Sequence, residues 1–230
     1  MDEKLHLDIN AKMEQVALLV FPEFNQQLID NMCRELNSIV ELYHSILNEN
    51  TIYCSGEWSG ERFKQDFLMT AVWSIREGKQ TELWPNLKKV SGDLIIDCIM
   101  DMIESAKTDM SSDEVVAKGL VPKVIGVAAA TEILHKYYPK KYPLRKRKSE
   151  WALAQFLYSG DVSKVSALSY SEFISQMEFL AYISDNLCTS KGLKLPENCR
   201  FFFIDKLFVK MAEHQEYCNS YAGQDQLSEI

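Results

Sequence analysis

The chain has 230 residues, of which 47% are hydrophobic and 25% charged, so it has the composition of an ordinary folded protein. Its 33 Asp and Glu outnumber its 25 Lys and Arg, which excludes a protein that coats nucleic acid with its whole surface. The polar, acidic start is not that of a signal peptide, and no apolar run reaches the ~20 residues of a membrane span. We therefore expect a cytoplasmic protein without a membrane partner.

Apolar residues at helical spacing predict an almost wholly α-helical protein, because they recur at i, i+3, i+4 and i+7. No alternating pattern is long enough to indicate a strand. Serines and glycines at the ends of the periodic runs set the expected boundaries. In chain order, the predicted helices span 29–47, 59–77, 91–107, 111–119, 122–138, 150–158, 169–186 and 199–217.

The predicted fold is a multi-helix globular all-α domain that divides into two helical halves. A soft boundary near residues 109–112 separates residues 1–110 from residues 111–218, and a polar tail follows at 219–230. Six cysteines occur without a C-x-x-C pair, and the four histidines lie at no zinc-finger offset from them. We therefore expect six reduced thiols and no metal site.

The sequence contains no motif that predicts a catalytic residue or a cofactor. Its nine glycines form neither a dinucleotide fingerprint nor a P-loop. Four acids line one face of the predicted helix 91–107, where carboxylates at this spacing are able to hold a metal or simply keep the helix face solvated. We favour the solvated face. These acids are Asp93, Asp97, Asp101 and Glu104.

Residues 136–148 read KYYPKKYPLRKRK and concentrate seven of the 25 basic residues in a stretch without an acid. Such a compact cluster of cations in an acidic chain predicts a binding site for an anionic partner, and nucleic acid fits because each cation can neutralise a phosphate. Three tyrosines in the stretch are suited either to stack on bases or to anchor the loop. The predicted nucleic-acid-binding cations are Lys136, Lys140, Lys141, Arg145, Lys146, Arg147 and Lys148.

Gly126 lies in a run of small residues that leads into the predicted helix before the basic segment. The order hydrophobic–Gly–hydrophobic resembles the turn of helix-hairpin-helix DNA-binding proteins, in which backbone N–H groups face a phosphate. We therefore predict that Gly126 takes part in nucleic-acid binding. The alternative is close packing of helices through Ala128, Ala129 and Ala130.

The last hundred residues resemble a helical module of prokaryotic restriction and phage-defence proteins, including some that accompany NTPases of the 5-methylcytosine-restriction type. The resemblance implies a defence-related, nucleic-acid-associated helical protein without an active site of its own. Arg145–Lys148 departs from the pattern, which often has Asn and Ser or Arg there. The matching residues are Ile133, Leu134, Pro139, Tyr142, Pro143, Leu144, Ala152, Leu153, Tyr170, Phe173 and Phe208.

The leading interpretation is a non-catalytic accessory subunit of a bacterial phage-defence or DNA-processing complex, acting without a cofactor. Its basic loop would bind nucleic acid, DNA in preference to RNA, and its helical surface would bind a larger NTPase or nuclease subunit. Two alternatives stay open. One is a pure protein-interaction scaffold. The other is a stand-alone nuclease or glycosylase-like enzyme that draws carboxylates from Glu57, Asp93, Asp97 or Glu132.

Overall fold

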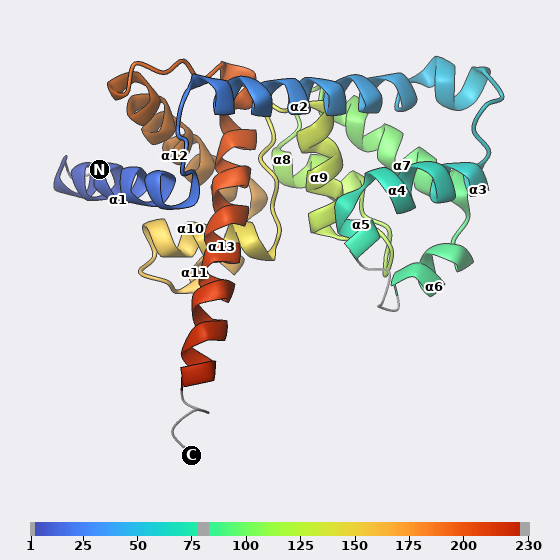
Figure 1. The fold of residues 1–230 in the computed structure, drawn as a ribbon. Helices are drawn as coiled ribbons and strands as arrows, with labels where there is room; N and C mark the ends of the chain where they lie inside the picture. The colour runs from blue at the N-terminus through green and yellow to red at the C-terminus, as the bar shows by residue number, and fades with distance from the viewer. Residues whose placement is uncertain (1–2, 78–82, 226–230) are drawn as a thin grey trace. The chain divides into compact units, whose positions relative to one another are not determined.

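The computed structural model describes residues 3–77 and 83–225, and these residues form a multi-helix all-α protein (Figure 1). The prediction of the fold class is confirmed. Extended pairing within the described residues is limited to one β-bridge between Val121 and Ile125. The helical elements are α1 (Glu3–Val20), α2 (Gln26–Ile46), η1 (Asn50–Cys54), α3 (Gly60–Arg62), η2 (Phe63–Leu68), α4 (Met69–Ala71), α5 (Trp73–Glu77), α6 (Leu83–Lys89), α7 (Gly92–Ser105), α8 (Ser112–Lys118), α9 (Val127–Tyr137), α10 (Arg147–Leu157), α11 (Val162–Ser166), α12 (Tyr170–Ser190), η4 (Glu197–Cys199) and α13 (Arg200–Asp225).

The main differences from the predicted helices lie in the N-terminal half and before α9. Residues Glu3–Val20 form α1, to which the sequence analysis had assigned no helix. The predicted helix 59–77 is interrupted, because Val72 takes extended backbone angles between α4 and α5. The predicted helix 122–138 begins only at Val127, since the bridge between Val121 and Ile125 closes a turn before it.

Contacts divide the chain into two units, which are described separately. The first unit comprises Met1–Cys33, Arg147–Leu168 and Ser175–Ile230, and the second comprises Arg34–Lys146 and Ser169–Ile174. The sequence analysis divided the chain at residue 110 instead. The two units do not follow chain order, because α2 and α12 each contribute residues to both.

The first unit is built around α13, which packs against α1 and α10. The helix begins with a run of phenylalanines, and Phe203 and Phe208 are fully buried. Phe203 packs against Phe21 with ring centroids 6.0 Å apart, and Phe208 packs against Phe156 at the same distance. Helix α13 extends to Asp225, so it includes part of the segment that we predicted to be a polar tail. Residues 226–230 of that tail lie outside the described residues.

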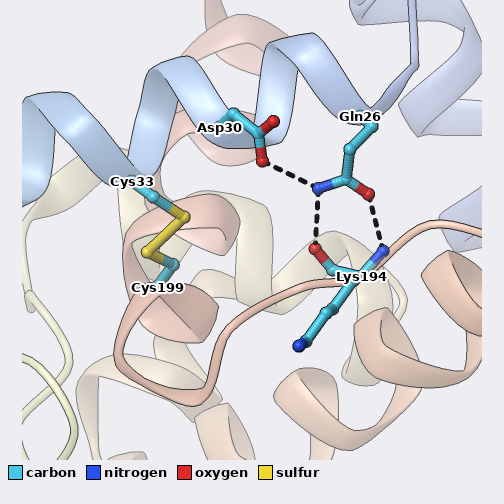
Figure 2. The surroundings of a disulfide bond; sticks show 5 residues. All are labelled: Gln26, Asp30, Cys33, Lys194 and Cys199. Atoms are coloured by element: carbon cyan, nitrogen blue, oxygen red, sulfur yellow. Dashed lines mark hydrogen bonds between the residues drawn. A yellow bond between two sulfur atoms is a disulfide. The ribbon is translucent and has the colours of Figure 1, made fainter.

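Two links fasten the segment before α13 to the start of α2 in the first unit (Figure 2). The Gln26 side-chain amide donates to the Lys194 carbonyl at 3.1 Å and accepts from the Lys194 N–H at 2.8 Å. Cys33 and Cys199 form a disulfide with their Cα atoms 5.8 Å apart, inside the usual range for such a bond. The prediction of six reduced thiols is therefore wrong for these two residues, which the fold brings together across a sequence separation of 166.

The second unit is organised around α7, which contacts α3, α8 and α9. Its buried face carries large apolar side chains such as Ile95, Ile99 and Ile103. At its start the backbone meets that of α3 so closely that a Cβ atom on Gly92 would lie 2.1 Å from the Gly60 carbonyl oxygen. Both glycines are needed because neither position has room for a side chain. The sequence had indicated only the starts of two helices there.

We expect reduction of the disulfide to destabilise the protein, because it removes a cross-link that restricts the unfolded chain. The expected loss in free energy of unfolding is about 2–5 kcal/mol. Urea unfolding with and without a dithiol reductant measures it, and Cys33→Ser should reproduce the effect. Cys54→Ser is the matched control, since Cys54 is a free, exposed cysteine. Equal stability in oxidised and reduced samples would contradict the cross-link.

Replacing Gly92 with alanine should push the starts of α3 and α7 apart. We expect a loss of about 1–3 kcal/mol in the free energy of unfolding, as for an overpacked core. Gly126→Ala serves as the comparison, because a Cβ there would meet no atom within 4 Å. Thermal unfolding of both variants tests the close approach of the Gly60 and Gly92 backbones. The approach is refuted if Gly92→Ala is no less stable than Gly126→Ala.

Candidate nucleic-acid interface

The basic segment continues from the last turn of α9 through a loop to the first residues of α10. The loop turns tightly after α9, with the Lys141 N–H donating to the Tyr138 carbonyl at 3.0 Å. It then runs back beside α9. The His135 Nδ1 lies 2.8 Å from the Tyr142 carbonyl, and the Arg145 N–H donates to the Thr131 hydroxyl at 3.2 Å. The loop is therefore fastened to α9 at two levels of the helix.

The cations of the segment divide into a surface group and a buried group. Lys140, Lys141, Arg147 and Lys148 are exposed, and Lys146 is half-buried. The Lys141 ammonium also donates to the Ala106 carbonyl at 2.8 Å. Lys140, Lys141 and Lys146 belong to the second unit, and Arg147 and Lys148 begin α10 in the first. Lys136 and Arg145 retain only 2% and 9% of their exposure, so they present little to a partner.

Lys136 forms a buried ion pair with Glu132, one turn earlier on α9. Its ammonium also donates to the Ala71 carbonyl at 3.0 Å and to the Tyr43 hydroxyl at 3.2 Å. The Trp73 ring lies beneath it, 3.8 Å from centroid to nitrogen. Burial lowers the pKa of the Lys136 amine, and the Glu132 carboxylate offsets part of this shift. These contacts give Lys136 a structural role inside the second unit.

The other side of this cluster is the start of α5. Glu132 accepts hydrogen bonds from the Trp73 N–H at 2.6 Å and from the Ser74 N–H at 2.8 Å, and from the Ser74 hydroxyl. The first N–H groups of a helix have no partner inside the helix, so a carboxylate from elsewhere can satisfy them. Glu132 thus caps α5 from α9.

Arg145 also has internal contacts. Its guanidinium lies over the Phe173 ring at 5.2 Å from the centroid, while its backbone bonds with Thr131. Phe173 belongs to the part of α12 that lies in the second unit. A cation over an aromatic face in a mostly buried setting stabilises the fold. Arg145 therefore contributes to holding the loop in place.

The three tyrosines of the segment pack against protein. The Tyr142 ring is fully buried and stacks at 6.4 Å on Tyr170, whose hydroxyl donates to the Pro143 carbonyl. The Tyr138 hydroxyl donates to a backbone carbonyl of α7 at 3.3 Å, and burial raises the pKa of Tyr138 to about 12. The Tyr137 ring packs against the His44 ring, with 4.1 Å between the two ring centroids. Of the two roles considered for these tyrosines, the contacts support anchoring of the loop.

Gly126 is the exposed residue before the first turn of α9, and it has no side chain with which to cap that turn. The turn before it contains Lys123, which is exposed and has a left-handed φ of 63°. Ala129 and Ala130 are buried, in agreement with the packing alternative for the small-residue run. The helix-hairpin-helix-like function of this turn stays a prediction.

The acids of α7 are exposed or half-buried, and three have a polar partner. Asp97 accepts from the Tyr53 hydroxyl at 3.0 Å, Asp101 pairs with Lys118 at 3.2 Å, and Glu104 pairs with Lys107. Among the described residues, no three His, Cys, Asp or Glu side chains are grouped so that they would hold a metal ion. None of the described helices combines the length and apolarity needed to cross a membrane.

No family model, curated protein or solved structure matches this chain. The resemblance to restriction and phage-defence modules therefore stays a prediction from sequence. The residues that carry it are mostly interior, as Ile133, Leu153 and Phe208 are fully buried. These residues belong to the packed interior, whereas the exposed cations after Tyr138 are not among the matching residues.

The sequence analysis missed the Glu132–Lys136 pair. An i, i+4 pair of opposite charges usually lies on a solvated face, and Lys136 was therefore grouped with its basic neighbours. A signal was present, because Ile133 and Leu134 beside the pair are apolar and Ala129 and Ala130 precede it. A helix that is apolar on most of its circumference leaves little surface for a charge.

Lys136→Met should destabilise the protein by about 3–5 kcal/mol, because it leaves the Glu132 carboxylate buried without its cation. The double variant Glu132→Gln/Lys136→Met should recover part of this loss, since it removes the uncompensated charge while keeping an acceptor for α5. Urea unfolding of the two variants gives the comparison. A single variant as stable as the unchanged protein would show that Lys136 is solvated.

Proposed function

We propose that the chain is a non-catalytic accessory subunit of a bacterial phage-defence or DNA-processing complex. It binds nucleic acid through the surface cations of residues 140–148 and binds a larger NTPase or nuclease subunit through its helical surface. The observation that carries the proposal is the presence of five exposed or half-buried cations within nine consecutive residues of an otherwise acidic chain.

The charge distribution favours a small contact with phosphates. Each cation that neutralises a phosphate of duplex DNA releases a counterion. It steepens the fall of the logarithm of the binding constant with the logarithm of the salt concentration by ~0.9. Excess acids elsewhere in the chain repel further lengths of a polyanion. The binding is therefore local, salt-sensitive and weak when the chain acts alone, as suits a subunit whose partner makes additional contacts.

The packing of the tyrosines favours recognition of phosphates over recognition of bases. Single-strand binders stack bases on exposed aromatic rings. Tyr137 and Tyr138 are half-buried and Tyr142 is buried, so the three rings offer less surface for stacking than exposed aromatic side chains would. We therefore expect a preference for duplex over single strands and little dependence on base sequence. The start of α9 at Gly126 lies in the second unit, like Lys140 and Lys141, and its first N–H groups are further donors for a phosphate.

The partner subunit accounts for the chemistry that this chain lacks. The resemblance of the last hundred residues to restriction and phage-defence modules supports a partner of the NTPase or nuclease class. Exposed apolar side chains in the first unit support a protein contact, since Leu18 and Leu19 are adjacent on α1 and 51% and 58% exposed.

The test is fluorescence anisotropy of a labelled 20-base-pair duplex over a salt series, with three variants that each remove two positive charges. Lys140→Gln/Lys141→Gln and Arg147→Gln/Lys148→Gln change the segment. Each should weaken binding about tenfold and reduce the salt slope by about two. The control Lys164→Gln/Lys210→Gln changes exposed lysines elsewhere and should have little effect.

Equal losses of duplex affinity in all three variants would mean that only the net charge of the chain matters. Absence of duplex binding by the unchanged chain at 50 mM salt would refute the interface. Co-purification with a larger subunit in the absence of nucleic-acid binding would instead identify a protein-interaction scaffold. Cleavage of the duplex by the purified chain in the presence of a divalent metal would overturn the non-catalytic role.

A further inference from the structure

A cavity of about 210 Å³ in the second unit lies between η2 and α6. It does not involve the basic segment, and nothing in the proposed function uses it. Both charged and apolar side chains line it. The lining residues are Glu61, Lys64, Gln65, Met69, Leu87 and Lys88.

The wide winding of η2 shapes one wall of this cavity. Residues Phe63–Leu68 form a π-helix, and the Met69 N–H donates to the carbonyl of Lys64, five residues earlier. In an α-helix, residues five apart point in clearly different directions, whereas a π turn brings them to the same side. The π winding therefore places Lys64 and Met69 together on the cavity wall. Such turns are frequent at functional sites.

Lys64 supplies a buried cation at the wall. Only 2% of the residue is exposed, and its ammonium donates to the Val90 carbonyl at 3.0 Å and pairs with Glu61. An ammonium has three N–H donors. Within the part of the chain that the structure describes, these two acceptors leave one donor unassigned. Since Lys64 lines the cavity, an acceptor inside it would complete the set.

The remaining lining residues define the chemistry of the ligand. Lys88 is exposed and adds a second positive charge to that of Lys64. With the negative charge of Glu61 subtracted, the lining has a net charge of one positive unit. Met69 and the buried Leu87 add an apolar surface. The volume exceeds the ~150 Å³ of an engineered apolar cavity that binds benzene. There is accordingly room for a ring and an anionic group together.

We propose that this cavity binds a small organic anion, in which a phosphate or carboxylate is attached to an apolar group about the size of a benzene ring. The anion lies between the Lys64 and Lys88 ammonium groups, and the apolar group lies on Met69 and Leu87. Glu61 is exposed and can turn toward solvent as the anion takes its place beside Lys64.

Phenyl phosphate is the probe, titrated into the full ¹⁵N-labelled chain and followed by NMR. Saturable shifts are expected at the amides of Gln65, Met69, Leu87 and Lys88. Phenol lacks the anion and inorganic phosphate lacks the ring, so each should bind at least tenfold more weakly. Lys88→Gln should weaken phenyl phosphate binding about threefold to fivefold, as expected for one exposed charge contact.

Lys89→Gln is the matched control, because Lys89 is the exposed neighbour of Lys88 on α6 and does not line the cavity. It should leave the affinity unchanged, while Met69→Trp should fill the cavity and abolish binding. Equal effects of Lys88→Gln and Lys89→Gln would overturn the proposal. So would inorganic phosphate binding as tightly as phenyl phosphate, or shifts centred on residues 140–148. These outcomes do not depend on whether the chain binds a duplex.

Discussion

The second unit depends on how the partly buried N–H groups at the start of α5 find hydrogen-bond acceptors. Val72 interrupts the helical path, and the N–H groups of Trp73 and Ser74 that follow have no helical partner. A buried donor without an acceptor costs ~1–3 kcal/mol, so the fold must supply one. Glu132 supplies it from α9, and its buried charge in turn requires the Lys136 cation. The break at Val72 therefore determines the inward-facing residues of α9.

The orientation of α9 then determines the loop that carries the cations. With Glu132 and Lys136 facing α5, the neighbouring positions Thr131 and His135 face the returning loop and bond to it. Asp113 fastens a second helix start in the same way, by accepting from the Tyr170 and Ser171 N–H groups. Burial alone would raise the pKa of Asp113, but these hydrogen bonds outweigh it and lower the pKa. Two internal carboxylates thus hold helix starts within this unit.

The sequence was sufficient for most of the long helices and insufficient for these long-range contacts. Local periodicity revealed α7 and most other helices because apolar spacing reflects the burial of one face. Val72 and Trp73 are apolar and fit a continuous helical pattern, so the interruption between them left no local signal. The Cys33–Cys199 bond and the Gly60–Gly92 approach join segments distant in sequence, and no spacing rule connects them.

The candidate interface shows why a count of charges is a poor description of a binding surface. Seven cations in thirteen residues suggest a uniform basic patch. Lys136 is committed to Glu132, and Arg145 to the Phe173 ring, so these two support the loop from within. The surface cations occur in two adjacent pairs with the half-buried Lys146 before the second pair. Each pair can neutralise only one or two phosphates, and neither pair is long enough to follow a groove. The acids of the remaining chain oppose any extension of the contact, so a stable assembly on nucleic acid requires additional cations from a partner subunit.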